Sequence, residues 1–391
     1  MLLKATRLLD GTGGAAVHQA AVRVEGERIS AVGIVDDFDT RAEETTDLGE
    51  ATLLPGLIDM HGHLRLSHLE PEPQQQIKDD PSRYIDKSAE NLRASLLGGV
   101  TTMRCNGDRD FIDLDLRQRV ADGDMYGPRL LVATRGIKAP DCTGGMVATV
   151  LVDGEDRIRA AIHENAGRGA DHIKIFSSGG LGPRETATAA FWTASELRAA
   201  VDAAHSDNLP IVAHCHGGPS AMPLIEAGVD TIEHGSYLTS AELEEMTRRG
   251  TRLDMTLGIL LSDRSVAHQH LKESLGQDEF ARMVEENLDT MRTAVALGVR
   301  ITLGTDTMHG MLWFEAATLA SLGVPNAKVI ATLTSRAAEA LNRSDQFGTL
   351  ESGRIADIIA IDGNPLEDIG SLERPVLVMS RGRIMHRSAT E

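Results

Sequence analysis

Cysteine and positive charge are both scarce in this chain. Its 391 residues include three Cys, and 58 Asp and Glu outnumber 39 Lys and Arg, which gives a formal net charge of −19 at pH 7. Three scattered cysteines exclude a disulfide framework and are typical of a reducing compartment. The acidic balance argues against nucleic acid as a partner, because phosphate backbones are bound by clustered Lys and Arg. We attribute the negative charge to solubility.

Long hydrophobic runs are also missing. The first residues, Met1 to Arg7, contain no apolar segment followed by a small-residue cleavage site, so they do not resemble a secretory signal. Elsewhere, charged or polar residues interrupt every apolar run, well before the ~20 residues that span a bilayer. We therefore expect a cytoplasmic protein with no membrane partner.

The length of the chain indicates two domains, because one hydrophobic core rarely extends beyond roughly 250–300 residues. Residues 1–55 and 345–391 both contain short strand-like runs separated by turn dipeptides such as Asp10-Gly11 and Asp362-Gly363. Neither end has enough strands to bury a core by itself. We expect the two ends to pair into one composite β-sandwich domain, with residues 56–344 forming the catalytic domain.

The central segment alternates between apolar strand-like runs and amphipathic helical stretches. The runs are 57–61, 100–104, 129–133, 172–176, 211–214, 231–234, 252–256 and 301–306. The helices are expected near 86–98, 155–167, 193–206, 239–249, 279–297 and 335–342. Two of them begin with capping boxes, Thr193-x-x-Glu196 and Thr239-x-x-Glu242. This alternation predicts an α/β fold of the (β/α)8 TIM-barrel type, with an open doubly wound sheet as the alternative.

Metal-ligating residue types stand where several of these runs end, and barrel enzymes build their sites at that end of the strands. The first run leads into His61-Gly62-His63, and strand alternation places both imidazoles on one face. Such a pair suits a borderline-soft dication such as zinc. By itself the triplet is a weak signal, because His-x-His also occurs by chance.

Four further runs carry residues of the same kind, within the run 172–176 and at or just after the ends of the other three. They supply Lys174, the pair His214 and His216, His234, and Asp306. Each has an ordinary explanation when taken alone, since Lys can extend past a strand end and His or Asp can form local hydrogen bonds in a loop. A buried unpaired ammonium, however, would cost several kcal/mol. Placed together on one face of one barrel, these side chains predict a metal site.

With these residues in view, the chain resembles the amidohydrolase superfamily. The segments that carry the resemblance are Pro55-Gly56-Leu57-Ile58-Asp59-Met60-His61-Gly62-His63, Ile173-Lys174, His214, Glu233-His234-Gly235, Gly304-Thr305-Asp306 and, in the tail, residues 348–357 and 363–368. The match covers essentially the whole chain, and the motifs taken together are highly specific. The resemblance implies a metal-dependent hydrolase.

Within the superfamily, the chain is similar to members in which a carboxylated lysine bridges two metals. The implied ligands are His61, His63 and Asp306 for one divalent ion, expected to be zinc, and His214 and His234 for the second. Lys174, carboxylated by carbon dioxide, would bridge the two ions together with a hydroxide. Asp306 would move the proton from that hydroxide to the leaving amine. Whether His214 or His216 is the fifth-strand ligand stays open, the resemblance favouring His214.

The prolidase-like and imidazolonepropionase-like branch is the most similar one, on residues 170–174, 214–217 and 228–235. The resemblance implies a small-molecule substrate such as a dipeptide, an N-acyl amino acid or a cyclic amide. Two loops depart from the branch pattern. Met146 stands where His is frequent, and residues 104–108 read Arg-Cys-Asn-Gly-Asp in place of the usual Arg-Asp-x-Gly. Because such loops shape substrate preference, dipeptidase or carboxypeptidase activity does not follow from the resemblance.

Loop residues supply the candidates for substrate contacts. They follow the strand runs closely and are His216, Tyr237, Arg135, Lys138, Arg184 and His309. The three cations could pair with a substrate carboxylate, the tyrosine could hydrogen-bond the scissile group, and the histidines could support a ligand. For each, an ordinary surface role is an equal alternative. The polar segment 64–82 is compatible with a lid or with an exposed loop.

Two other functions stay open. A mononuclear aminohydrolase, which deaminates a heterocycle, shares the fold, but relatives of that type typically lack the lysine found here at position 174. A non-catalytic scaffold also shares the fold, but such relatives usually lose ligands that this chain keeps. The sequence does not identify the substrate, the metal used in vivo, or whether the chain forms a homo-oligomer.

Overall fold

The computed structural model describes residues 1–391 except 42–43, 79–80, 147 and 389–391. All eight strand-like runs of the central segment are strands. They are β6 (Leu57–Gly62), β7 (Val100–Cys105), β8 (Arg129–Val132), β11 (Ile173–Phe176), β12 (Ile211–Cys215), β13 (Thr231–His234), β14 (Arg252–Met255) and β15 (Arg300–Leu303).

These strands are parallel and close on themselves. β6, β7 and β8 form one run of neighbours, and β11 to β15 form the other. A parallel bridge between Gly62 and Asp306 joins β15 to β6, and the Asp171 N–H donates to Val132 O at 2.8 Å beside β8 and β11. The closure confirms the predicted barrel and excludes the open doubly wound sheet. Two short strands, β9 (Gly136–Lys138) and β10 (Ala148–Leu151), extend the sheet of β11 to β15, because β9 pairs with β11 and β10 pairs with β9.

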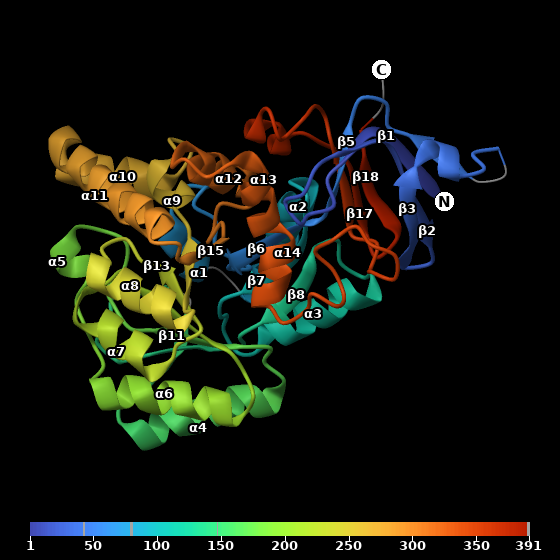
Figure 1. The fold of residues 1–391 in the computed structure, drawn as a ribbon. Coiled ribbons are helices and arrows are strands. Elements are labelled where there is room, and N and C mark those ends of the chain that lie inside the picture. The colour runs from blue at the N-terminus through green and yellow to red at the C-terminus, as the bar shows by residue number, and fades with distance from the viewer. Residues whose placement is uncertain (42–43, 79–80, 147, 389–391) are drawn as a thin grey trace.

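Helices lie outside the strands, as α4, α6, α7 and α8 do in Figure 1. The six predicted helices are present as α2 (Pro81–Leu97), α4 (Glu155–Arg168), α6 (Ala194–Ser206), α8 (Ser240–Arg249), α11 (Gln277–Ala296) and α14 (Ser335–Ala340). The remaining helices are α1 (Pro73–Lys78), α3 (Ile112–Asp122), α5 (Arg184–Ala187), α7 (Ala221–Ala227), α9 (Gly258–Leu261), α10 (Val266–Leu275), α12 (Leu312–Ser321) and α13 (Asn326–Leu333). Both predicted capping boxes form, at Thr193 and Thr239.

The two chain ends build one further sheet, in the order β18-β17-β16-β5-β1-β2-β3 with β4 beside β1. Its strands are β1 (Leu2–Leu8), β2 (Val17–Glu25), β3 (Arg28–Ile34), β4 (Thr45–Asp47), β5 (Thr52–Pro55), β16 (Ile358–Ile361), β17 (Pro375–Ser380) and β18 (Arg383–Arg387). The antiparallel pair of β5 with β16 joins the N-terminal strands to the C-terminal ones. The predicted association of both ends is therefore confirmed, while the domain limits 1–55 with 345–391 and 56–344 stay a prediction.

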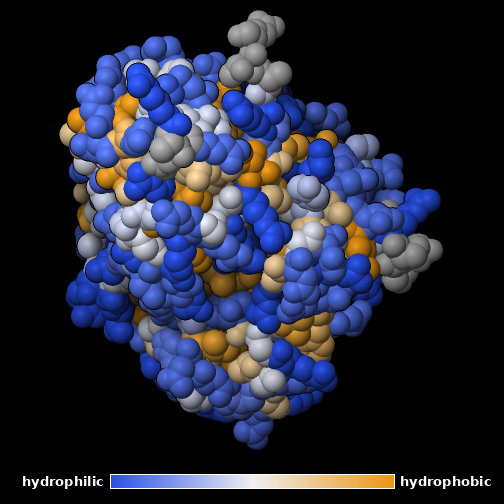
Figure 2. Space-filling model, turned by 90° about the vertical axis from the view of Figure 1, so that its right-hand side faces the viewer, coloured by the Kyte–Doolittle hydropathy of each residue, from blue (hydrophilic) through white to orange (hydrophobic). Residues whose placement is uncertain are grey.

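Side-chain alternation shows how this end sheet packs. Ile358 and Ala360 of β16 enter the core of the end sheet, whereas Ile359 and Ile361 on its other face join the core of the barrel. Burying both faces of one strand makes the two cores contiguous. On the face of the molecule shown in Figure 2, hydrophilic side chains predominate and hydrophobic ones gather in smaller groups. In the described part of the chain, no helix has the length and apolar composition needed to cross a bilayer.

A buried ion pair also connects the barrel to the end sheet. Arg129 Nη1, in β8, lies 2.7 Å from Asp357 Oδ2, whose side chain is 4% exposed. Removing one partner of a buried pair leaves the other charge uncompensated, so Asp357→Ala should lower the free energy of unfolding by about 3–5 kcal/mol. Denaturant unfolding measures this change. Asp115→Ala, which breaks the exposed pair with Arg119, should cost less than about 1 kcal/mol, and equal losses in the two variants would contradict the structural role.

Candidate metal centre

β6 and β15 bring two imidazoles and a carboxylate together at the carboxyl end of the barrel. His61 Nε2 lies 3.3 Å from His63 Nε2. Asp306 Oδ1 lies 3.8 Å from His61 Nε2 and 3.5 Å from His63 Nε2. The backbone sets this arrangement, because the Asp306 N–H donates to His61 O at 2.7 Å and the His63 N–H donates to Asp306 O at 3.0 Å.

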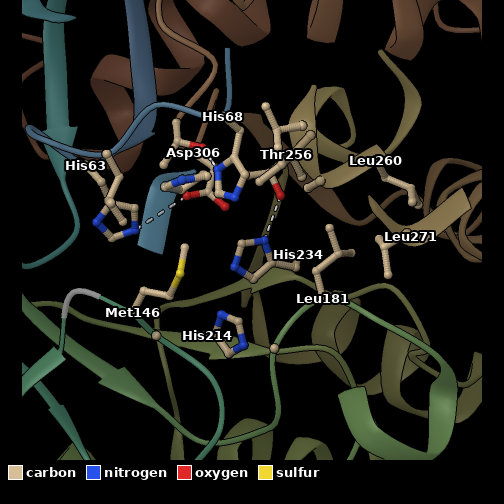
Figure 3. Close-up of a pocket in the computed structure, with 18 of the residues that line it drawn as sticks. His63, His68, Met146, Leu181, His214, His234, Thr256, Leu260, Leu271 and Asp306 are labelled. Atoms are coloured by element: carbon tan, nitrogen blue, oxygen red, sulfur yellow. Dashed lines mark hydrogen bonds and ion pairs between the residues drawn. The ribbon is translucent and has the colours of Figure 1, made fainter. Parts of the chain in front are cut away.

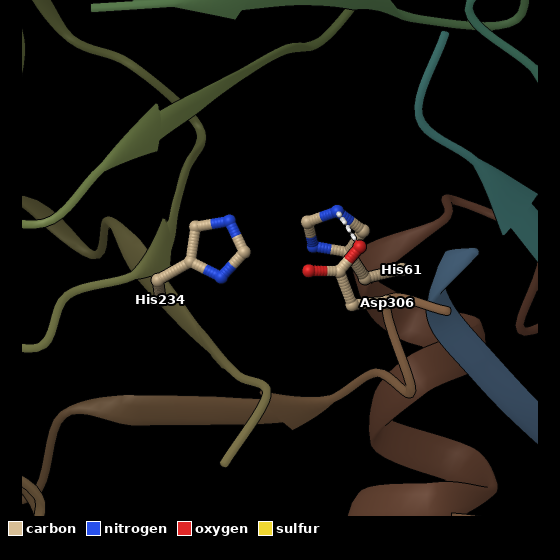
Figure 4. A group of neighbouring side chains, drawn as sticks. All are labelled: His61, His234 and Asp306. Atoms are coloured by element: carbon tan, nitrogen blue, oxygen red, sulfur yellow. Dashed lines mark ion pairs between the residues drawn. The ribbon is translucent and has the colours of Figure 1, made fainter. Parts of the chain in front are cut away.

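β12 and β13 bring a second group of imidazoles to the same place. The ring centroid of His234 lies 5.0 Å from that of His61, 4.6 Å from that of His214 and 4.9 Å from that of His216. Ligand atoms of His61, His234 and Asp306 all lie within 4.8 Å of one another, and Figure 4 shows these three side chains pointing toward one another. The structure therefore brings the five predicted protein ligands other than Lys174, and His216 with them, into one cluster.

Hydrogen bonds fix how these imidazoles are turned. His63 Nδ1 lies 3.3 Å from Gly107 O, and His214 Nε2 lies 2.7 Å from Gly179 O. Because a carbonyl oxygen only accepts, those nitrogens carry the protons, and the other ring nitrogen of each residue keeps a lone pair. His234 Nδ1 is similarly bonded to Thr256 Oγ1 at 2.7 Å, visible in Figure 3. Such outer hydrogen bonds are typical of metal-ligating histidines.

Burial keeps the cluster in the protonation state that binds metals. It lowers the pKa of His63 to about 3 and the pKa values of His61, His214 and His234 well below the ordinary value of histidine. A neutral imidazole is the ligating form. Burial also raises the pKa of Asp306 to about 6.

Lys174 lies on the inner side of the cluster, in the middle of β11. Its side chain is fully buried, and its Nζ contacts Glu233 Oε2. Burial lowers the pKa of the Lys174 ammonium well below its ordinary value. Glu233 Oε1 in turn lies 3.6 Å from His61 Nδ1. One carboxylate thus stands between the lysine and the first histidine of the cluster.

A buried polar network around Glu233 was not predicted as part of the site. Arg104 Nη2 lies 3.3 Å from Glu233 Oε1 and 3.4 Å from Asp254 Oδ2. Asn106 Nδ2 also donates to Glu233 Oε1, and Asn106 Oδ1 lies 2.9 Å from His172 Nε2. The available signal was the placement of charged residues inside apolar strand runs, where burial requires a partner.

A cavity of about 600 Å³ opens over the cluster. Its described lining includes His63, His214, His216, His234 and Asp306 at one end. The opposite end is aliphatic, and Figure 3 shows Leu181, Leu260 and Leu271 beyond His234. Part of the segment 64–82 lines the cavity through Leu66, His68 and residues 72–75, whereas residues 79–80 lie outside the described part of the chain.

Of the predicted substrate contacts, the structure places His216 in the cavity and the others elsewhere. Arg135, Lys138, Arg184, Tyr237 and His309 are absent from its described lining. The Tyr237 hydroxyl donates to Gly182 O at 2.8 Å. His309 Nε2 lies 2.9 Å from Leu66 O, and its Nδ1 lies 3.1 Å from Ser95 Oγ, so it braces the segment that follows His63. Met146, which the sequence singled out, does line the cavity.

A parallel barrel with imidazoles and a carboxylate converging at its strand ends defines the class of barrel hydrolases that work with metal ions. A model of the Amidohydrolase family matches residues 52–385. The chain belongs to this family and is a hydrolase of carbon–nitrogen bonds, as predicted.

Three relatives illustrate the relationship. Ochratoxinase of Aspergillus niger is 26% identical over 93% of this chain and 82% of its own length. Imidazolonepropionase of Nocardia farcinica is 24% identical over 88% of this chain and 86% of its own length. The crystal structure of a Xaa-Pro dipeptidase with bound methionine in the active site has a TM-score of 0.88 and 28% identity, covering 98% of this chain and 99% of that one. The predicted prolidase-like and imidazolonepropionase-like relationship is confirmed.

Proposed function

We propose that this chain hydrolyses an amide-type C–N bond of a small molecule with a binuclear metal centre. The relatives named for dipeptide, ochratoxin and imidazolone substrates support the type of bond by analogy. The observation that carries the proposal is the cluster of His61, His234 and Asp306, whose ligand-type atoms all lie within 4.8 Å of one another. His63 Nε2 joins it 3.5 Å from Asp306 Oδ1. Neutral imidazoles with one carboxylate form a donor set that suits zinc.

The proposed ligands follow from the two halves of the cluster. His61, His63 and Asp306 would hold one divalent ion, His214 and His234 the second, and a carboxylated Lys174 would bridge them. When bound, two such ions lower the pKa of a water and polarise the scissile carbonyl.

Glu233 is well placed to assist the carboxylation of Lys174. Carboxylation joins the neutral amine nitrogen to the carbon of carbon dioxide and releases one N–H proton. The contact of Lys174 Nζ with Glu233 Oε2 supplies the acceptor for that proton. The low pKa that burial imposes on Lys174 favours the neutral amine that reacts. The product is an anionic group that replaces a buried cation beside the proposed metals.

Two side chains at the cavity floor would handle protons during the reaction. Asp306, whose side chain is 16% exposed, accepts the proton of the attacking water and passes it to the nitrogen of the leaving amine. His216 lines the cavity, and its buried Nε2 has no hydrogen-bond partner among the described atoms, while its Nδ1 lies 2.9 Å from Ser236 Oγ. We assign His216 the role of donating from Nε2 to the carbonyl oxygen of the substrate.

Alanine variants of His214 and His216 distinguish a ligand from a substrate contact. His214→Ala should lose the second metal ion and most activity. His216→Ala should keep both ions while kcat/KM falls by about 10²–10³. Elemental analysis and steady-state kinetics on the two variants measure this, with wild type as reference. If His216→Ala loses a metal ion and His214→Ala retains both, His216 is the metal ligand and His214 the substrate contact.

The experiment that tests the proposed function is a substrate screen on protein stripped by a chelator and then reconstituted with zinc. We expect hydrolysis of at least one amide, lactam or carbamate, lost on chelation and restored by zinc. Ammonia released from a heterocycle would favour the aminohydrolase alternative instead. Failure of the protein to retain any metal would favour the alternative that the chain is a non-catalytic scaffold.

The cellular location stays a prediction. Cys105, Cys142 and Cys215 are all buried free thiols, as the proposed reducing, cytoplasmic environment would leave them.

A further inference from the structure

We infer that the substrate is a neutral amide with a bulky aliphatic group and no free carboxylate, rather than a dipeptide or an N-acyl amino acid. The inference rests on the proposed function and adds the substrate class. It comes from the shape and chemistry of the cavity beyond the metal ligands.

An aliphatic compartment forms the part of the cavity away from the metal ligands. Its walls are Leu181, Ile259, Leu260, Val266 and Leu271, of which the last four come from α9 and α10. Leu257 and Ala267 add to the same surface. A cavity of about 600 Å³ falls within the ordinary range for small-molecule sites. Because these walls offer no hydrogen bonds, they select an apolar group of the substrate.

The part of the cavity lining that the structure describes offers no guanidinium or ammonium group to pair with a carboxylate. Its described lining contains no Arg or Lys, and its carboxyl side chains are Asp306 and Glu72. The polar lining residues apart from the metal ligands are amides, hydroxyls and imidazoles. These imidazoles belong to His68, His216 and His270. Burial lowers the pKa of His68 to about 4, so this ring is uncharged at neutral pH. A desolvated carboxylate needs a charged or multiple hydrogen-bonding partner.

The three cations that the sequence offered for this role are engaged elsewhere. Arg135 Nη2 lies 2.6 Å from Glu164 Oε2. Arg184 stacks over the ring of Tyr237 at 4.7 Å and lies 3.4 Å from Glu286. Lys138 Nζ donates to Gly144 O and Gly145 O at 3.1 and 3.3 Å. A substrate carboxylate would have to compete for each of them.

A matched pair of compounds tests the substrate class. N-hexanoyl-leucine and N-(3-methylbutyl)hexanamide differ only in the carboxylate. On zinc-loaded wild type, we expect kcat/KM for the neutral amide to be higher by at least about tenfold. On metal-free wild type, calorimetry should show the neutral amide binding tighter by at least about tenfold, or 1.4 kcal/mol. Equal or tighter binding of the carboxylate overturns the inference. Tighter binding of the neutral amide without turnover supports it while counting against the proposed hydrolysis.

A pair of variants on α10 tests where the selectivity lies. Leu271 lines the cavity, whereas Leu275, one turn further along the same helix, does not belong to its described lining. Both are partly buried in the same apolar cluster. Leu271→Arg should shift the binding ratio toward N-hexanoyl-leucine by at least about tenfold, and Leu275→Arg should leave it unchanged. Equal binding ratios in the two folded variants would contradict the assignment of the selectivity to the aliphatic compartment. If Leu271→Arg does not fold, the comparison of the two compounds on wild type decides the substrate class.

Discussion

Lys174→Ala is expected to retain at most one metal ion per chain and to lose more than about a hundredfold in kcat/KM. Lys174 is fully buried at the inner side of the imidazole cluster, where alanine can neither carry a carboxylate nor balance the charge of two dications. The same truncation removes the contact of Lys174 with Glu233, which keeps its ion pair with Arg104. Elemental analysis and steady-state kinetics measure the two losses.

The proposed carboxylation of Lys174 can be tested independently of activity. Protein exchanged into carbon-13-labelled bicarbonate with zinc should show a carbamate carbon signal in its NMR spectrum, and Lys174→Ala should not. Lys138→Ala is the matched control, because Lys138 donates to loop carbonyls rather than to the cluster. Full activity with two ions in Lys174→Ala would remove the bridging role.

Asp306→Asn should lower kcat by about 10²–10⁴ because an amide cannot accept the proton of the attacking water. The asparagine oxygen can still ligate a metal, so metal content should fall less than in Lys174→Ala. Asp306 Oδ1 lies 3.5 Å from His63 Nε2 and 3.8 Å from His61 Nε2. Because the backbone of Asp306 is hydrogen-bonded to the backbone of both residues, the substitution preserves the local geometry.

Glu72→Gln provides the control for this experiment. Glu72 is the other described carboxylate of the cavity lining, and we place it outside the reaction. Its kcat should stay within about threefold of wild type, a change smaller than 1 kcal/mol. A similarly small effect of Asp306→Asn would contradict the proton transfer assigned to Asp306.

The barrel was predictable because its strands carry a strong local signal. Each strand run is apolar, ends in a polar residue or Gly, and precedes a helix or a loop, so the eight runs could be read without tertiary information. Helix α12 was missed because most of its residues are apolar, so its sequence shows no amphipathic pattern. Its sequence, Leu-Trp-Phe-Glu-Ala-Ala-Thr-Leu-Ala-Ser, has no clear polar face, since the helix packs under η3 (Ile369–Glu373) and α13.

The ligand cluster was predictable for the same reason that the strands were. The period-two alternation of a strand determines the face toward which His61, His63 and His214 point. The closure of the barrel then brings these faces together. Loop residues have no such constraint. Arg184 and Tyr237 follow barrel strands in the sequence, yet they contact each other outside the described cavity lining.

The charged network and the aliphatic compartment depend on tertiary contacts. Glu233 contacts Lys174 and Arg104 across the barrel. Because these residues lie on three strands that are distant in sequence, their pairing can be recognised only once the strands are placed in the barrel. Leu260 and Leu271 read as ordinary core residues in the sequence. Only the folding of α9 and α10 over the barrel mouth turns them into the wall of a binding site.

Titration of the metal-free chain with zinc tests the proposed binuclear centre. Bound zinc, measured by elemental analysis, and hydrolysis of an amide substrate are followed together. We expect binding to saturate at two ions per chain and activity to reach its maximum only with the second. Saturation of both binding and activity at one ion per chain would contradict it.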